Sequence, residues 1–130
     1  MAKPLQLSCI GQISVTIHDL SRAVAFYRDI LGMRLLFEVP PKMAFFDCGG
    51  LRLMLAVPEE PEFNHPSSIL YYRVDDIQEA WESLSEAGVD LRRPPHLLAR
   101  MKDHDLWMAF FRDTEGNMLA LMSEVRAPQP

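Results

Sequence analysis

The chain of 130 residues repeats one residue pattern at a spacing of 57 residues. The segment from Val15 to Ala23 has alternating aliphatic residues, then an aspartate followed by an aliphatic residue, then an alanine three positions later. The segment from Tyr72 to Ala80 has the same pattern at the same steps, with the aromatic Tyr72 in the place of Val15. Such self-similarity predicts two copies of one supersecondary unit. Because neither copy is large enough to bury both faces of its own sheet, we expect the two modules to combine in a single domain spanning residues 1–130.

Each copy shows the order β-α-β-β-β, which predicts an α+β fold. Asp19 or Ser21 caps the first helix and Gly32 ends it, while Asp76 and Gly88 do the same for the second helix. The apolar stripe expected along the first helix is Leu20, Ala23, Val24, Tyr27, Ile30 and Leu31. The expected strands are 10–17, 34–39, 43–47 and 51–56 in module one (about 8–57), and 68–74, 90–101, 106–112 and 118–125 in module two (about 68–125), with a linker at about 58–67.

Composition excludes several classes of protein. Hydrophobic residues make up 48% and charged residues 24%, as in ordinary globular domains. The net charge of −5 repels phosphate backbones and anionic lipid surfaces, so we expect no nucleic acid and no membrane as partner. No apolar run approaches the ~20 residues of a membrane span. Cys9 and Cys48 have no metal or redox spacing, which predicts reduced thiols in a cytoplasmic protein.

Two segments carry the hallmarks of a known fold family. The first is Gln12-Ile-Ser-Val-Thr-Ile-His-Asp-Leu, continued by Ala25-Phe-Tyr-Arg-Asp-Ile-Leu-Gly32. The second, Phe111-Arg-Asp-Thr-Glu-Gly-Asn117, is similar to an F-x-D-P-x-G-N turn, with threonine in place of proline. Over residues 10–124 the chain therefore resembles the vicinal oxygen chelate superfamily, which contains glyoxalase I, bleomycin-resistance proteins and extradiol dioxygenases. The resemblance implies two βαβββ modules that form a curved sheet around a concave cavity, and it leaves the function open.

The resemblance also implies where a metal ion would be held. Members of the family take one metal ligand from the first and last strand of each module, and these positions are occupied here by Gln12, Met54, Ile69 and Ala120. Gln12 offers a carbonyl oxygen, and Met54 offers a soft thioether in a site built for harder metals. Ile69 and Ala120 have no donor atom. We therefore expect no metal and no other cofactor, and a divalent metal is the alternative.

Strand alternation predicts which side chains share the cavity face with these four positions. Arg52 and Arg73 favour an anionic or carbonyl-bearing small-molecule ligand, and the alternative is that they are solvated or paired with carboxylates. The predicted ligand-binding residues are Gln12, Ser14, Arg52, Met54, Ile69, Tyr71, Arg73, His96, Phe110, Ala120 and Met122.

Two histidines allow a different chemistry. His96 and His104 flank a predicted hairpin and, with Asp103 or Asp105, could form a metal site outside the family pattern or an acid–base pair. The alternative is that one histidine lies in a turn and the other at a strand end facing solvent. No residue is assigned a catalytic role on this evidence.

Several functions follow from these features. The missing ligands and the apolar face favour a metal-independent small-molecule-binding protein of the bleomycin-resistance kind. The alternative is an enzyme of the same superfamily, a glyoxalase-like lyase or isomerase or a dioxygenase, with Tyr71, His96 or Glu124 as acid or base. A structural or regulatory partner domain is a third reading. Open sheet edges predict a homodimer, and modules could pair within one chain or between chains.

Overall fold

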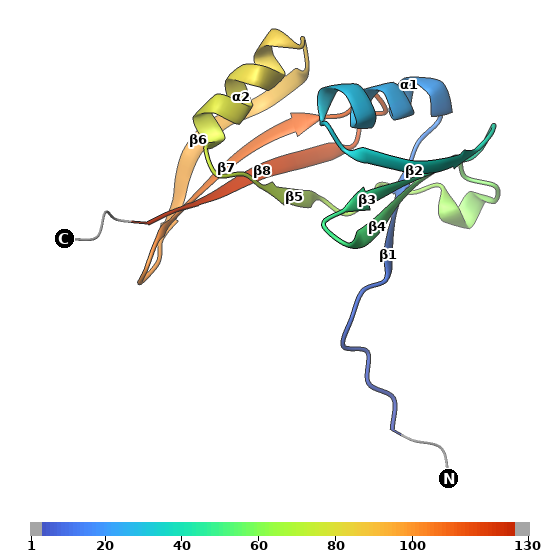
Figure 1. Ribbon diagram of the computed structural model, residues 1–130, viewed down its shortest axis with the longest axis horizontal. Helices are drawn as coiled ribbons and strands as arrows, with labels where there is room; N and C mark the ends of the chain where they lie inside the picture. The colour runs from blue at the N-terminus through green and yellow to red at the C-terminus, as the bar shows by residue number, and fades with distance from the viewer. Residues whose placement is uncertain (1–3, 127–130) are drawn as a thin grey trace. The chain divides into compact units, whose positions relative to one another are not determined.

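The protein is described by a computed structural model that covers residues 4–126 (Figure 1). The chain forms two compact units, Met1–Asn64 and His65–Pro130, and each contains one of the two predicted modules. The boundary follows a short 3₁₀ helix, η2 (Pro61–Phe63), within the stretch 58–67. Among the helices of residues 4–126, none is long and apolar enough to cross a membrane.

The two modules have the same topology, and the α+β prediction is confirmed. In each module the first strand pairs in parallel with the last, and the other neighbours are antiparallel. Module one has the strand order β1-β4-β3-β2 and contains β1 (Gln12–Thr16), α1 (Leu20–Ala25), the π-helix η1 (Phe26–Ile30), β2 (Arg34–Val39), β3 (Met43–Cys48) and β4 (Leu51–Ala56). Module two has the order β5-β8-β7-β6 and contains β5 (Leu70–Arg73), α2 (Ile77–Glu86), β6 (Asp90–Arg100), β7 (Asp105–Arg112) and β8 (Met118–Val125).

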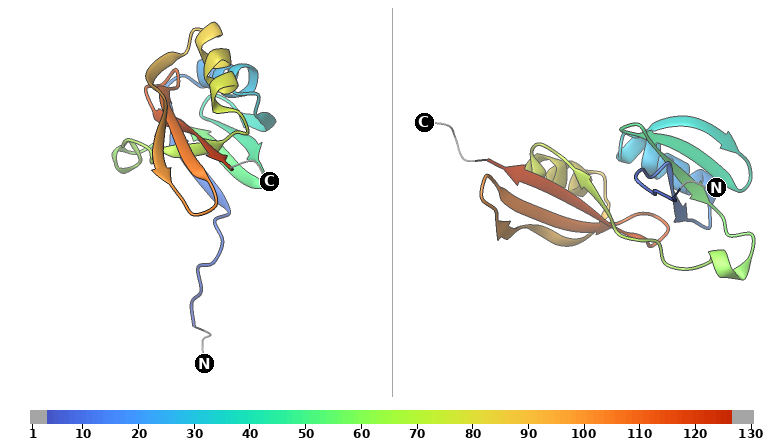
Figure 2. Two further views of the ribbon diagram at one scale, coloured as in Figure 1. Left: turned by 90° about the vertical axis from the view of Figure 1, so that its left-hand side faces the viewer. Right: turned by 90° about the horizontal axis from the view of Figure 1, so that it is seen from below.

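The helix of each module lies against one face of its own sheet (Figure 2). Residues that alternate along the strands toward this helix are aliphatic or aromatic and buried, as period-two patterning predicts. These cores stabilise the modules through the removal of apolar area from water. The core residues are Val15, Ile17, Tyr27, Phe46, Leu53 and Leu55 in module one, and Ile77, Leu84, Ala109, Phe111, Leu119 and Leu121 in module two.

The aspartate shared by both copies of the repeat begins each helix. The Asp19 carboxylate accepts a hydrogen bond from the backbone N–H of Arg22 at 3.1 Å. The Asp76 carboxylate accepts one from the N–H of Glu79, also at 3.1 Å. Each carboxylate satisfies an N–H group that the first helical turn leaves without a partner. Of the two caps predicted for the first helix, the structure has Asp19 and not Ser21, and the predicted Asp76 cap is confirmed.

The first helix ends before Gly32, whose φ of 70° confirms the predicted left-handed stop, but its last turn is a π-helix and the predicted place of Ile30 on the buried stripe is wrong. The Leu31 N–H donates to the Phe26 carbonyl at 3.0 Å, five residues back, which is the bond of a π-helix. This wider turn rotates the apolar stripe. Phe26 is buried (3% exposed), whereas Ile30, which the regular pattern placed on the stripe, is 38% exposed.

The turn between β7 and β8 is organised by one buried carboxylate. Asp113 Oδ1 accepts from the backbone N–H groups of Glu115 and Asn117, each at 2.8 Å, and Oδ2 accepts from the Asn117 side chain at 2.9 Å. Gly116 has a φ of 86°, which an L-residue rarely adopts. Because these contacts come from Asp113 and Asn117, the turn forms with threonine at the position where the resemblance expects proline.

Candidate functional site

Each sheet has a second face, opposite its helix, which we call the open face of the module. Pairing register places one row of side chains across all four strands of each open face. In module one this row is Ser14, Met54, Phe45 and Phe37. In module two the corresponding row is Tyr71, Ala120, Phe110 and Arg93. The predicted residues Ser14, Met54, Tyr71, Phe110 and Ala120 thus lie in two equivalent rows.

On module one, Arg52 is held by two neighbours. Its Nε donates to Gln12 Oε1 at 2.7 Å, and its guanidinium carbon lies 5.6 Å from the centroid of the Phe45 ring. The Gln12 amide nitrogen in turn faces Met54 Sδ at 3.7 Å. Phe45 stacks on Phe37 with ring centroids 4.6 Å apart and 25° between the planes. The structure thus joins three predicted site residues, Gln12, Arg52 and Met54, into one contact network.

On module two, Phe110 is the centre of an aromatic cluster. Tyr71 meets it edge-on at 6.1 Å and 79°, and His96 lies nearly parallel to it at 6.3 Å and 25°. The Arg93 guanidinium carbon lies 5.8 Å from the Phe110 ring centroid. Ala120, which was expected to line a cavity, is fully buried (0% exposed), because Tyr71 and Phe110 flank it on the neighbouring strands.

A pocket of about 320 Å³ opens beside this cluster. Ile69, Phe110 and Met118 give it apolar walls, and Arg92 and Arg93 bring two guanidinium groups. Arg92 is paired with Asp90 at 2.8 Å. Ile69 lies just before β5 rather than within it and is 43% exposed. The pocket combines an apolar lining with cationic groups, which is the usual make-up of a site for a small organic anion.

Sequence reasoning missed Arg92 and Arg93 as site residues. β6 carries register shifts between Leu91 and Arg93 and again between Arg93 and His96, so simple alternation fails along it. The sequence feature that could have indicated them is the pair Arg92-Arg93 followed directly by two prolines, because Arg93 pairs in register with Phe110. A further arginine, Arg112, pairs in register with Met118, and its buried Nε has no hydrogen-bond partner in the described part of the chain.

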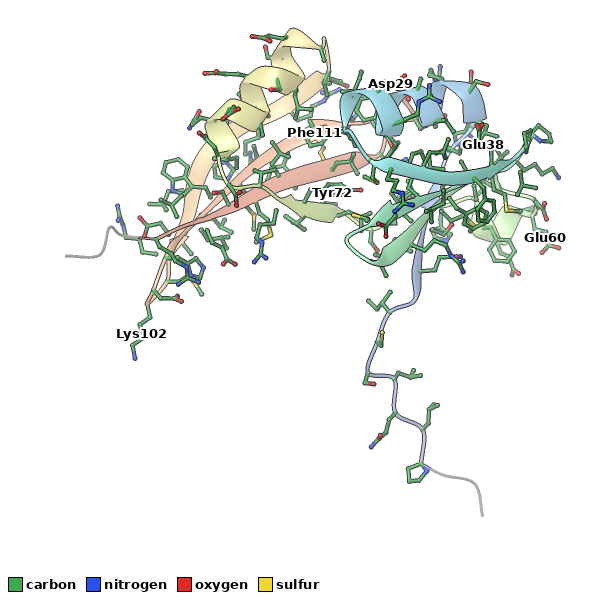
Figure 3. All side chains as sticks on the ribbon, in the orientation of Figure 1. Asp29, Glu38, Glu60, Tyr72, Lys102 and Phe111 are labelled. Atoms are coloured by element: carbon green, nitrogen blue, oxygen red, sulfur yellow. The ribbon has the colours of Figure 1, made fainter. Side chains whose placement is uncertain are left out.

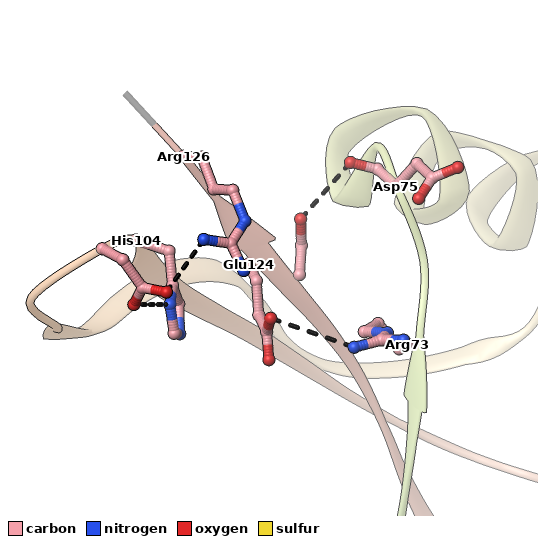
Figure 4. A network of polar contacts seen from close by, with 7 residues as sticks. Arg73, Asp75, His104, Glu124 and Arg126 are labelled. Atoms are coloured by element: carbon pink, nitrogen blue, oxygen red, sulfur yellow. Dashed lines mark hydrogen bonds and ion pairs between the residues drawn. The ribbon is translucent and has the colours of Figure 1, made fainter. Parts of the chain in front are cut away.

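The other predicted arginine, Arg73, is paired rather than free. Its Nη1 lies 3.9 Å from Glu124 Oε1, which matches the alternative of carboxylate pairing (Figure 4). Met122 pairs in register with Arg73 on β5 and with Met108 on β7, and it is partly buried. The Arg73 charge on the open face is therefore balanced by Glu124, whereas Arg93, near the pocket, lies over the Phe110 ring.

The two histidines contact different residues and do not form one site: His96 lies in β6, and His104 lies in the turn before β7. His96 Nδ1 is 3.0 Å from the Pro94 carbonyl oxygen, in β6. His104, at the hairpin tip marked by Lys102 in Figure 3, has Nδ1 2.7 Å from Asp103 Oδ1, and Arg126 Nη1 donates to Asp103 Oδ2 at 2.8 Å. The hydrogen bond from Arg126, followed by that of His104, lowers the pKa of the Asp103 carboxyl. Over residues 4–126 no three His, Cys, Asp or Glu side chains gather as metal ligands.

Comparison with known proteins gives the family. The model of the Glyoxalase/Bleomycin resistance protein/Dioxygenase superfamily matches residues 9–121. The chain belongs to this superfamily. Among its relatives is the Bacillus subtilis (strain 168) protein named Uncharacterized protein YraH, 27% identical over 123 residues, covering 85% of this chain and 94% of the relative. Metallothiol transferase FosB of Staphylococcus saprophyticus is 26% identical over 121 residues, covering 88% of this chain and 76% of that protein.

Solved structures of the superfamily show the same fold. Lactoylglutathione lyase from Agrobacterium tumefaciens is similar with a TM-score of 0.73 and 21% identity, covering 91% of this chain and 95% of that one. A superfamily member from Sphaerobacter thermophilus DSM 20745 has a TM-score of 0.74 and 22% identity, covering 92% and 100%. At this identity the likeness establishes the fold alone.

The residues at the family's four metal-ligand positions do not fit a metal ion. Ile69 and Ala120 have no donor atom, and Ala120 is buried between two aromatic rings. Gln12 directs its carbonyl oxygen to the Arg52 guanidinium, and the Met54 sulfur faces the Gln12 amide. The only oxygen donor among the four positions, Gln12 Oε1, therefore already accepts a hydrogen bond from the Arg52 guanidinium, whose positive charge repels a metal cation.

Proposed function

We propose that this protein binds a small organic molecule on its open faces without a metal ion, and that the ligand carries an anionic or carbonyl group. The observation that carries the proposal is the pocket of about 320 Å³ lined by Ile69, Phe110 and Met118 together with Arg92 and Arg93. Its volume suits a ligand of modest size, and its guanidinium groups recognise carboxylate or carbonyl oxygens. We assign no catalytic residue.

The test has two parts. The protein is purified without chelator and its metal content is measured by inductively coupled plasma mass spectrometry. A library of small organic acids and neutral compounds is then screened by thermal shift in buffer containing EDTA. We expect substoichiometric metal and ligand-induced stabilisation in EDTA. Phe110→Leu and Arg93→Met are expected to reduce that stabilisation, while Lys42→Met, in module one, serves as the charge-matched control.

An enzyme of the same superfamily is the second candidate. The observation that favours it is the similarity over 121 residues to a protein named Metallothiol transferase FosB, a name that describes an enzyme. In this reading Tyr71, His96 or Glu124 supplies acid or base chemistry. A stoichiometric divalent metal that is lost on Gln12→Ala substitution would favour this candidate over the metal-independent one.

Assembly and location are proposed on separate evidence. The edge strand β2 exposes Leu36, Phe37 and Val39, and such a strand supports pairing of two copies in a homodimer. The free thiols of Cys9 and Cys48 support a reducing, cytoplasmic environment. Light scattering coupled to size-exclusion chromatography measures the first proposal directly.

A further inference from the structure

We propose that Arg52 is a prearranged anchor for the carboxylate of an aromatic carboxylate ligand, next to Gln12 and Met54, two of the positions that the family resemblance associates with metal ligands. This inference rests on the proposed small-molecule binding and names its ligand class and its specificity residue. It concerns the open face of module one, whereas the pocket that supports the proposed function lies on module two.

Gln12 fixes one side of the guanidinium group. Arg52 Nε donates to Gln12 Oε1 at 2.7 Å, a short distance for an N–H···O bond. With Nε occupied, Nη1 and Nη2 remain as two parallel donors, the arrangement that meets both oxygens of a carboxylate. Gln12 is itself held, because its amide nitrogen faces Met54 Sδ at 3.7 Å.

Phe45 provides a second contact to the guanidinium group. The Arg52 guanidinium carbon lies 5.6 Å from the Phe45 ring centroid, within cation–π range. Phe45 is stacked on Phe37 of the edge strand at 4.6 Å. This stack of two rings places exposed aromatic surface next to the anchor, which the aromatic part of a ligand can contact while its carboxylate meets Arg52.

Arg52 has no carboxylate partner in the described part of the chain. Asp47 lies directly opposite it in register, yet Asp47 Oδ1 accepts from the Gly50 N–H at 3.0 Å instead. By contrast, several other arginines are paired with a carboxylate, among them Arg28, Arg73, Arg92, Arg100 and Arg126. In a protein of net charge −5, an oriented guanidinium without a counter-charge is suited to an external anion.

Arg93 of module two is the nearest counterpart and is less constrained. It also lies over a phenylalanine, Phe110, at 5.8 Å, but no hydrogen bond to a described residue holds its guanidinium nitrogens. Ordering a free arginine on a ligand costs side-chain entropy that Arg52 has already lost to Gln12 and Phe45. The anchor role is therefore assigned to Arg52.

The probes are 2-naphthoate and its neutral isostere 2-naphthamide, titrated by isothermal calorimetry into the full chain in low-salt buffer with EDTA. We expect 2-naphthoate to bind more tightly than 2-naphthamide. Arg52→Met should weaken 2-naphthoate at least about ten-fold, the size of a lost charged hydrogen bond, and leave 2-naphthamide unchanged. Arg52→Lys should recover only part of the affinity, because an ammonium group cannot form the paired contact. Gln12→Ala should weaken 2-naphthoate by a smaller factor.

Arg28→Met is the control for net charge, because Arg28 is in the same module and already paired with Asp29 at 2.8 Å. Arg52 is exposed, and thermal melts of every variant check that the fold is kept. Equal binding of 2-naphthoate by wild type and Arg52→Met, or equal loss with Arg28→Met, overturns the anchor. If wild type binds neutral compounds but not 2-naphthoate, the anchor fails and the proposed function stands. If it binds no small molecule, both fail.

Discussion

The open faces of the two modules are formed by equivalent strands, but the large and the small side chain of the first row exchange places between them. Module one pairs a small Ser14 on its first strand with a large Met54 on its last, whereas module two pairs a large Tyr71 with a small Ala120. Both rows continue into a phenylalanine and an arginine–ring contact. The repeated scaffold therefore preserves strand pairing while each face acquires its own chemistry, an oriented cation on module one and an aromatic pocket on module two.

The sharpest test of this comparison contrasts the helix-covered side with the open side of each module. Phe46 and Phe111 are fully buried, and their sequence neighbours Phe45 and Phe110 lie on the open faces. We expect Phe46→Ala and Phe111→Ala each to reduce the free energy of unfolding by about 3–5 kcal/mol, because each leaves a cavity. Phe45→Ala and Phe110→Ala should cost clearly less. Urea unfolding measures all four, and similar losses at neighbouring positions would refute the assignment of faces.

The second test introduces a carboxylate at the last-strand position of the family's metal-ligand set in each module. Ala120→Glu buries a charge between Tyr71 and Phe110, and we expect a loss of about 3 kcal/mol or more in stability. Met54→Glu, at the partly exposed equivalent position beside Arg52, should cost less than about 1 kcal/mol. Thermal unfolding compares the two, with Ala120→Met separating the effect of size from that of charge. A tolerated Ala120→Glu variant would show that the two rings leave room for a ligand group.

The third test concerns the turns that precede the last strands. Asp113→Ala removes the acceptor of two backbone N–H groups and one side-chain amide, and we expect a loss of about 1–3 kcal/mol. Asp47→Ala removes the acceptor of the single Gly50 N–H bond and should cost about 0.5–1 kcal/mol. Asp113→Asn keeps an oxygen acceptor and should recover part of the loss. Chemical denaturation gives the values, and an equal cost at both turns would contradict the comparison.

The smallest expected effect is a pH dependence from two exposed aspartates. Hydrogen bonds from Arg126 and then His104 lower the pKa of Asp103, and a hydrogen bond from Arg28 lowers the pKa of Asp29. A lowered folded-state pKa contributes stability above the ordinary value of 3.8, and this contribution is lost as the pH falls through the folded value.

Asp103→Asn should therefore flatten the fall of the melting temperature in acid. Asp29→Asn should do so less, because its partner Arg28 is adjacent in the chain and stays close to it in the unfolded state. Melting curves across the acidic range measure both variants. A steeper acid transition in Asp103→Asn than in wild type would contradict the sign of the effect.

Much of each open face followed from period-two alternation. That rule placed Gln12, Ser14 and Arg52 together on β1 and β4, where the strands are regular and paired in register. It failed on β6, whose register shifts moved Arg92 and Arg93 into the pocket lining. The predicted helical stripe differed from the structure at Ile30, because a bond from the Leu31 N–H to the Phe26 carbonyl inserts a wider turn that no local pattern indicates.

By itself the sequence determined the two-module βαβββ architecture, the Asp76 helix cap and the departure from the family's metal-ligand set. These features depend on residue types at fixed short spacings, which local sterics and hydrogen bonding convert directly into structure. Only the tertiary structure decided that Arg52 binds Gln12 rather than Asp47, and that Tyr71 and Phe110 enclose Ala120. These outcomes depend on competition among side chains from different strands, whose packing the linear order does not specify.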